Sequence, residues 1–135
     1  MIFVDTSAWY ALEVEDDTNH KHALGFLSTL RDRRYGSLLT TDYVLDETVT
    51  LLWLRHGSAS GLQFLDKIHR SKSIRILWVD EVIFWETRDM MKARTDKRWS
   101  FTDFISFIVM QQMSIKDAFT FDKNFEQAGY TALPK

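Results

Sequence analysis

Apolar and polar positions along the chain predict short strands separated by longer helices. Compact apolar runs predict strands at residues 1–4, 37–40, 74–79 and 118–121, and a fifth, weaker run lies at 130–133. Apolar residues at helical spacing predict helices over 18–33, 42–56, 60–70, 80–94 and 103–113, with a short one at 7–12. Strands that alternate with helices indicate an α/β sandwich with a mainly parallel sheet, formed by residues 1–135 as one domain.

Four acidic residues fall where such a fold would place a ligand. Parallel sheets bind ligands beyond the carboxyl ends of their strands. Asp5 and Asp122 directly follow predicted strands, and Glu47 lies one turn into the helix after the second strand. Asp103 opens the most apolar helix, for which Thr102 is the expected N-cap, as Asp42 is for the helix after the second strand. We therefore predict that these four carboxylates share one edge of the sheet.

Each of these acids also has an ordinary structural interpretation. Asp5 and Asp122 suit the N-caps of the segments that follow them, and Asp103 suits a first helical turn. Glu47 is compatible with a surface position, although its apolar neighbours indicate a face turned partly inward. The sequence argues against a site role for Asp17, which falls in a polar loop.

Composition limits the chemistry that such a cluster can perform. The net charge is −2, so binding to nucleic acid through bulk positive charge is not expected. Clustered carboxylates need a cation, and an all-oxygen donor set suits Mg²⁺ or Mn²⁺ rather than zinc. The chain has no cysteine, no signal-peptide pattern and no membrane-length apolar run, and we expect a cytoplasmic protein.

Four segments together resemble the motifs of PIN-domain proteins, in the family's order. They are MIFVDTSAWYAL at the start, TTDYVLDETVTLL with Glu47, WSFTDFISFIVMQQMSI with Thr102 and Asp103, and KDAFTFDKNFEQAGYTAL with Asp122 and Phe125. Residues 57–98 match mainly in pattern. The nearest likeness is to VapC-like toxin ribonucleases of toxin–antitoxin pairs.

This resemblance implies a three-layer sandwich around a sheet of about five strands. It also implies an endoribonuclease that uses Mg²⁺, or Mn²⁺ as a substitute, to hydrolyse phosphodiester bonds of single-stranded or structured RNA. Asp5, Glu47, Asp103 and Asp122 would form the catalytic metal site, with Thr6 and Thr102 supporting it through their hydroxyls. Implied partners are a second copy of the chain, as a homodimer, and a small antitoxin that covers the acidic cleft.

Two residues at the start of the third motif are candidates for RNA contact. Trp99 and Arg98 lie together in a predicted loop, where an aromatic ring and a cation suit a base and a phosphate. Core packing is the ordinary interpretation of the tryptophans. Basic groups such as Arg31, Arg33 and Arg34 are most simply solvated helix ends.

Two other functions remain open at this point. One is a non-catalytic binding module on the same scaffold, which would bind RNA or protein without cleaving it. The other is a phosphotransfer domain with Asp5 as nucleophile, although dehalogenase-like enzymes would carry a second aspartate where this chain has Ser7.

Overall fold

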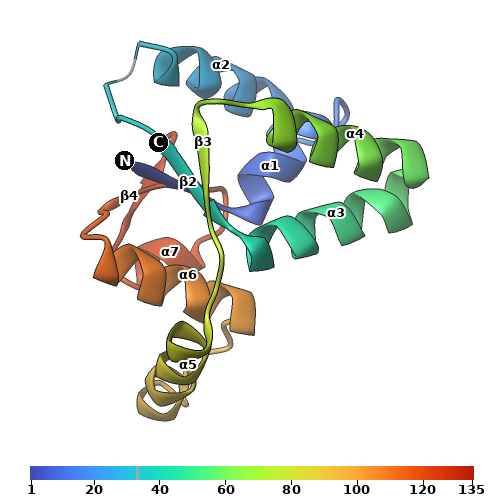
Figure 1. Ribbon diagram of the computed structural model, residues 1–135. Helices are drawn as coiled ribbons and strands as arrows, with labels where there is room; N and C mark the ends of the chain where they lie inside the picture. Colours follow the sequence, from blue (N-terminus) through green and yellow to red (C-terminus); the bar gives the residue numbers. More distant parts are fainter. Residues whose placement is uncertain (33) are drawn as a thin grey trace.

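A parallel five-stranded sheet forms the centre of the computed structural model, which describes residues 1–32 and 34–135 (Figure 1). Its strands lie in the order β3-β2-β1-β4-β5, and every neighbouring pair is parallel. The strands are β1 (Ile2–Val4), β2 (Leu38–Thr41), β3 (Ile74–Leu77), β4 (Asp117–Phe119) and β5 (Thr131–Leu133). The carboxyl ends of all five strands therefore meet at one edge of the sheet.

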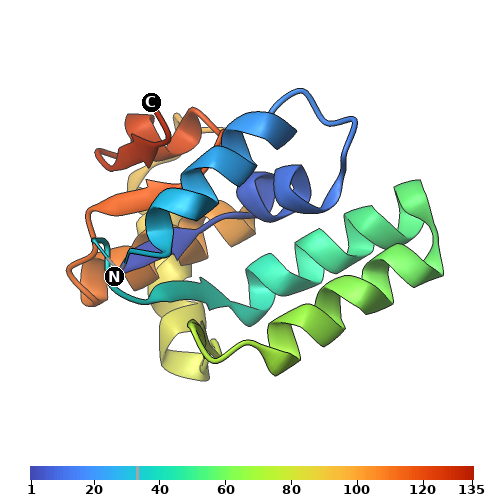
Figure 2. The same ribbon diagram turned by 90° about the horizontal axis from the view of Figure 1, so that it is seen from above.

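Helices cover both faces of the sheet, which gives three layers. In Figure 1, α2 lies above the strands and α6 and α7 lie below them, and Figure 2 shows α2 in front of the strands from above. Phe119 of β4 contacts Phe26 of α2 on one face, and Phe3 of β1 contacts Phe125 of α7 on the other. The helices are α1 (Thr6–Glu13), α2 (His20–Leu30), α3 (Asp42–His56), α4 (Ser58–Arg70), α5 (Glu81–Ala93), α6 (Phe101–Gln112) and α7 (Asn124–Gln127).

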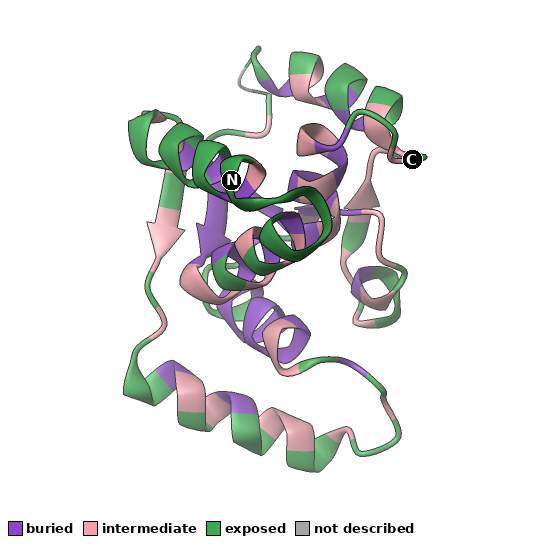
Figure 3. Cartoon of the chain, turned by 90° about the vertical axis from the view of Figure 1, so that its right-hand side faces the viewer, coloured by how far each residue is buried: buried purple, intermediate pink, exposed green. Residues whose placement is uncertain are grey.

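Two helical units extend from this sandwich. The α3–α4 pair runs out beyond the carboxyl end of β2, and α5 lies away from the sheet and packs against α6 (Figures 1 and 2). Buried residues concentrate in the strands and in α6, while α4 is largely exposed (Figure 3). Every residue of α6 from Asp103 to Met110 is buried, as the nearly all-apolar sequence of this helix predicts.

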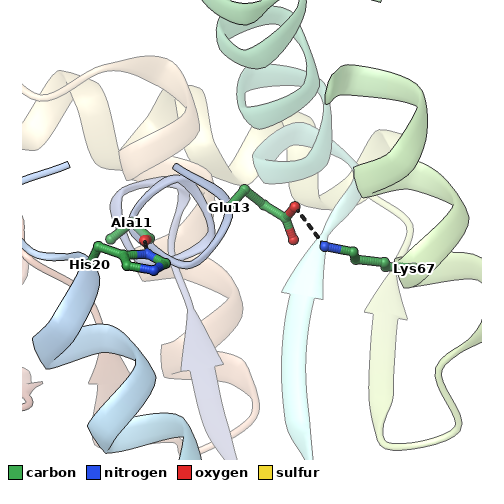
Figure 4. Close-up of polar contacts among 4 residues, drawn as sticks. All are labelled: Ala11, Glu13, His20 and Lys67. Carbon is green, nitrogen blue, oxygen red and sulfur yellow. Dashed lines mark hydrogen bonds and ion pairs between the residues drawn. The ribbon is translucent and has the colours of Figure 1, made fainter. Parts of the chain in front are cut away.

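Polar contacts tie α1 to the helices on either side of it (Figure 4). Lys67 Nζ of α4 lies 3.0 Å from Glu13 Oε2, and His20 Nδ1 donates to the carbonyl oxygen of Ala11 at 2.7 Å. The second contact fixes the start of α2 against α1. It thereby positions residues 14–19, which connect these two helices.

The α/β class and the parallel sheet are confirmed, and several predicted boundaries were wrong. The N-cap of α3 is Thr41, whose hydroxyl accepts from the Val44 amide, so Asp42 is the first helical residue instead of the cap. Helix α4 begins at Ser58 rather than residue 60, and β4 ends at Phe119 rather than residue 121. Helix α2 ends at Leu30, and Arg33, the predicted helix end, lies outside the described residues.

Within residues 1–32 and 34–135, no helix is both long enough and apolar enough to cross a membrane.

Candidate metal and catalytic site

A hollow of about 320 Å³ opens at the carboxyl edge of the sheet, and all four predicted acids line it. They arrive from different parts of the fold: Asp5 follows β1, Glu47 lies on α3, and Asp103 lies on α6. Asp122 lies between β4 and α7. The lining residues are Asp5, Thr6, Ser7, Tyr10, Asp17, Asn19, Glu47, Leu51, Arg55, Asp103, Phe121 and Asp122.

Asp5 is held by hydroxyl groups from both sides of the sheet edge. Only 3% of its surface is exposed, and its Oδ2 accepts hydrogen bonds from Ser7 Oγ at 2.8 Å and Thr120 Oγ1 at 3.0 Å. The Ser7 amide donates to the same oxygen at 3.3 Å, which makes Asp5 the N-cap of α1. The structural and functional interpretations of Asp5 are therefore compatible. Capping uses Oδ2, and Oδ1 accepts no hydrogen bond from the residues that the structure describes.

Ser7 and Thr120 also link Asp5 to the segment that carries Asp122. Ser7 Oγ accepts from the Phe121 amide at 2.8 Å, and Thr120 Oγ1 accepts from the Asp122 amide at 3.0 Å. The two hydroxyl oxygens lie 3.2 Å apart. Small hydroxyl side chains at these two positions therefore set the distance between the ends of β1 and β4.

Asp103 is fixed by a reciprocal cap at the start of α6. Its amide donates to Ser100 Oγ at 3.0 Å, and its Oδ2 accepts from the Ser100 amide at 3.3 Å. This geometry corrects two predictions: Ser100 is the N-cap in place of Thr102, and Asp103 is the third helical residue instead of the first. Because Asp103 follows the cap by three positions, its carboxylate turns back toward the helix start and the sheet edge.

Asn124 connects Asp103 with Asp122. Its side-chain amide donates to Asp103 Oδ2 at 3.0 Å, and its backbone amide donates to Asp122 Oδ1 at 2.9 Å. Asp122 therefore forms a local turn with its own backbone two residues on, as an aspartate before a short helix commonly does. The contact to Asp103 then joins this turn to α6.

Burial and mutual repulsion raise the pKa of the central aspartates. Burial is the main reason that the pKa of Asp5 rises to about 6, and the charge of Asp103 adds to the shift against the lowering effect of Ser7 and Thr120. Burial likewise raises the pKa of Asp103, and the charge of Asp122 adds to that shift. Two neighbouring carboxylates thus resist ionising, and a bound cation would remove this penalty.

The hydroxyls predicted to support the acids lie in different surroundings. Thr6 lines the hollow, and its Oγ1 is the buried side-chain oxygen without a hydrogen-bond partner in the described part of the chain. Such an atom is costly to bury without a partner. Thr102 is not among the lining residues, and its carbonyl oxygen accepts from Ser106 Oγ.

The ring of Trp99, for which an RNA contact was predicted, is buried in the core, and the contact itself stays a prediction. Trp99 is 7% exposed and packs edge-on against Phe104 and Phe107. Arg94 lies over the ring at 4.9 Å from its centroid. Arg98 is exposed but does not line the hollow, so an RNA contact there stays a prediction.

Several lining or supporting residues were not identified from the sequence. Asp17 was excluded as a loop residue, yet it lines the hollow, because the contact of His20 with Ala11 holds this loop against α1. Thr120 contacts Asp5 and Asn124 contacts Asp103 across distant segments, and no sequence spacing reveals these contacts. Arg55 carried a detectable signal, since it follows Glu47 by eight residues and so shares its helix face.

The residues in the hollow fit a small, hard divalent cation. Among residues 1–32 and 34–135, no three acidic or histidine side chains form a closed metal-binding group. Mg²⁺ does not require one, because it keeps several waters and binds proteins through one or two carboxylates. Asp5 and Asp103 each direct Oδ2 to protein donors and have a second oxygen available, so they are the ligands that this geometry favours.

Comparisons with known proteins agree with this fold. Residues 2–129 match the family model described as PIN domain. The chain is 32% identical over 133 residues to the 23S rRNA-specific endonuclease VapC20 of Mycobacterium tuberculosis, with 98% of each chain covered. It is 27% identical over 123 residues to a VapC ribonuclease of Archaeoglobus fulgidus, covering 90% of this chain and 77% of the relative.

Solved structures give the same result. The crystal structure of Mycobacterium tuberculosis VapC20, described as a sarcin-ricin loop cleaving toxin, superposes with a TM-score of 0.86 at 30% identity over 97% of both chains. FitAcB from Neisseria gonorrhoeae has a TM-score of 0.70 at 18% identity, covering 99% of this chain and 97% of that chain, which shows a shared fold.

These matches confirm the PIN-like fold, the likeness to VapC-type toxins and the predicted nuclease class. The matched range extends from the first strand to beyond Asp122 and so includes all four acids. The chain belongs to the PIN-domain family.

Proposed function

We propose that this chain is a Mg²⁺-dependent endoribonuclease whose metal site is formed by Asp5, Asp103, Glu47 and Asp122. One observation carries the proposal: four carboxylates from separate segments line one hollow at the carboxyl edge of the sheet. The raised pKa of Asp5 and Asp103 supports it, because such a cluster is unfavourable without a cation. The named activities of the relatives support RNA as the substrate.

We assign the four acids different roles according to their burial and their hydrogen bonds. Asp5 and Asp103 would hold the ion, since protein donors fix both carboxylates in place. Glu47 and Asp122, which are less buried, would complete the site through water or orient the attacking water. A divalent ion there would neutralise a phosphate oxygen and lower the pKa of a water for in-line attack on phosphorus. Mn²⁺, with the same preference for oxygen, would substitute.

We also propose the cellular role that the relatives suggest. The chain would act as one domain in the cytoplasm, as a toxin whose antitoxin covers the acidic hollow, and it would form a homodimer. Exposed apolar side chains on α3, α4, α5 and the segment before α5 support protein partners. These residues are Trp53, Leu54, Leu62, Trp78, Val82 and Trp85. Light scattering of the purified chain, alone and with its antitoxin, would test both associations.

An RNA cleavage assay tests the enzymatic proposal. The purified chain would be incubated with a single-stranded RNA and with a sarcin-ricin-type hairpin, each with Mg²⁺, with Mn²⁺ and with EDTA. We expect metal-dependent cleavage that Asp5→Asn lowers by at least about 100-fold, since a catalytic ligand is lost. Asp46→Asn is the matched control, because Asp46 is an exposed acid outside the hollow.

Two results would contradict the proposal. Equal cleavage by wild type and Asp5→Asn would exclude the assigned site. Retained Mg²⁺ binding without cleavage of either RNA would favour a non-catalytic binding module instead.

A further inference from the structure

Two helix faces lead away from the acids and form two walls of the hollow. On α1, Thr6 and Tyr10 line it, four residues apart. On α3, Glu47, Leu51 and Arg55 line it, again at four-residue intervals. Residues at this spacing lie on one face of a helix, so each wall is continuous. The hollow therefore has an acidic end at the sheet and a second end at Tyr10 and Arg55.

Arg55 gives the second end a different charge. The described lining contains five acids, and Arg55 is its one cationic side chain. Within the part of the chain that the structure describes, Arg55 forms no ion pair with any of these acids. The side chain is exposed, so its guanidinium is free to bind an anion that enters from solvent.

Neighbouring rings position this guanidinium. Arg55 Cζ lies 5.5 Å from the ring centroid of Tyr10, in a cation–π arrangement. The Tyr10 hydroxyl and His56 Nε2 share a 2.9 Å hydrogen bond, with ring centroids 5.8 Å apart. The bond joins α1 to the last turn of α3, so the ring beneath Arg55 is fixed from two helices. A guanidinium held in this way loses less conformational entropy when it binds a ligand.

The distance from Glu47 to Arg55 along α3 determines which part of a bound substrate Arg55 can contact. Eight residues of α-helix span about 12 Å, so Arg55 lies well beyond the phosphate that the acids would bind next to Glu47. A second phosphate of the same strand is the anion that lies at this distance. Arginine suits it, because its planar donors bind phosphate oxygens in pairs.

We propose that Arg55, positioned by Tyr10 and His56, binds a backbone phosphate of RNA on one side of the cleavage position. The strand would then run along the two walls, from the acids toward the end of α3. This inference rests on the proposed ribonuclease function, and it adds a specific contact to the substrate. It predicts that Arg55 contributes to binding of the strand and takes no part in the chemical step.

The first test compares the cleavage kinetics of Arg55 variants on unmodified RNA. Arg55→Ala should raise KM about 10- to 100-fold, the range of a lost charge-assisted contact, with a much smaller change in kcat. Arg55→Lys should recover part of the loss. Arg70→Ala is the matched control, because Arg70 is also an exposed arginine in the last turn of a helix and lies outside the hollow.

Methylphosphonate substitution, made one position at a time around the cleavage position, identifies the phosphate. At one flanking position, the methylphosphonate should raise the KM of the wild type about as much as Arg55→Ala raises it on unmodified RNA. The KM of Arg55→Ala should not rise further when this position is modified. If every methylphosphonate affects wild type and Arg55→Ala equally, the proposal is overturned.

A binding measurement separates this inference from the proposed catalysis. Fluorescence anisotropy of labelled RNA on Asp5→Asn protein does not depend on cleavage. Adding Arg55→Ala to this background should weaken binding and reduce the salt dependence of log K by about 0.7, the value for one phosphate contact on a single strand. An unchanged salt dependence would contradict the proposal, even if wild-type protein cleaves RNA. If Arg55→Ala reduces the salt dependence of binding as expected but the wild-type protein does not cleave RNA, only the proposed enzymatic function is contradicted.

Discussion

The side-chain amide of Asn124 donates a 3.0 Å hydrogen bond to Oδ2 of Asp103. The two residues are 21 positions apart, and the bond joins the start of α7 to the first turn of α6. Because the backbone amide of Asn124 also holds Asp122, this one residue fixes two of the four acids. The orientation of the acids in the candidate metal site therefore depends on a residue that is not itself acidic.

Replacing Asn124 should loosen the site while the fold stays intact. Asn124→Ala removes the donor to Asp103 and keeps the backbone amide that binds Asp122. Loss of a group that orients a metal ligand typically lowers metal affinity by about 10- to 100-fold. Isothermal titration with Mg²⁺ measures this change. Glu126→Ala, an exposed change in the same helix, should bind Mg²⁺ as wild type does. Equal affinity in both variants would show that Asn124 has no orienting role.

Thr120 should matter for its hydroxyl and much less for its methyl group. Its Oγ1 donates to Asp5 and accepts from the Asp122 amide, and the residue is 2% exposed. Thr120→Val leaves both groups without this partner, so we expect a loss of about 1–3 kcal/mol in stability and weaker Mg²⁺ binding. Thr120→Ser keeps the hydroxyl and should lose about 1 kcal/mol at most. Urea unfolding of the two variants distinguishes these cases, and a valine variant as stable as the serine variant would contradict this role.

Stability without metal should fall as pH rises, and Asp5 should cause a defined part of that fall. The pKa of Asp5 is about 6 in the folded protein against 3.8 for a free aspartate, so the folded state binds the proton more tightly. The contribution of Asp5 is therefore fully present below about pH 4 and is lost as pH rises through about 6. A shift of this size corresponds to about 3 kcal/mol.

Asp5→Asn isolates this contribution. In EDTA, the stability of wild type relative to Asp5→Asn should decrease between pH 4 and pH 7, as measured by urea unfolding at each pH. Adding Mg²⁺ at pH 7 should restore stability to wild type alone, because the ion favours the ionised carboxylate. Parallel pH profiles for the two proteins would show that Asp5 is not perturbed by folding.

The parallel sheet and the position of the acids at its edge could be predicted from the sequence, for related physical reasons. Buried parallel strands need continuous apolar runs, and such runs are visible at residues 2–4 and 38–39. An acid directly after such a strand must lie at the carboxyl edge, which is why Asp5 was placed correctly. Glu47 was placed through helix periodicity.

The details that the sequence did not reveal depend on contacts or on single-residue register. Trp99 lies in a loop, as predicted, but its ring fills a space between Phe104 and Phe107 that only the folded chain creates. The start of α6 offers both Ser100 and Thr102 as caps, and sequence pattern does not separate them. The structure selects Ser100, because Asp103 then completes the reciprocal cap three residues later.

The choice of cap has a direct energetic test. Ser100→Ala removes the acceptor of the Asp103 amide and should cost about 1 kcal/mol of stability. Thr102→Ala should cost less than about 0.5 kcal/mol, since its side chain caps nothing. Thermal unfolding of the two variants ranks them, and the reverse order would restore Thr102 as the cap.

Anomalous scattering from crystals grown with Mn²⁺ tests the proposed metal site, because it locates the ion itself. We expect one strong peak in the hollow, within ligand distance of Asp5 and Asp103, and its loss in Asp5→Asn crystals. A peak away from these two carboxylates, or a hollow without any peak in protein that cleaves RNA only with Mn²⁺, would contradict the assignment of the metal site.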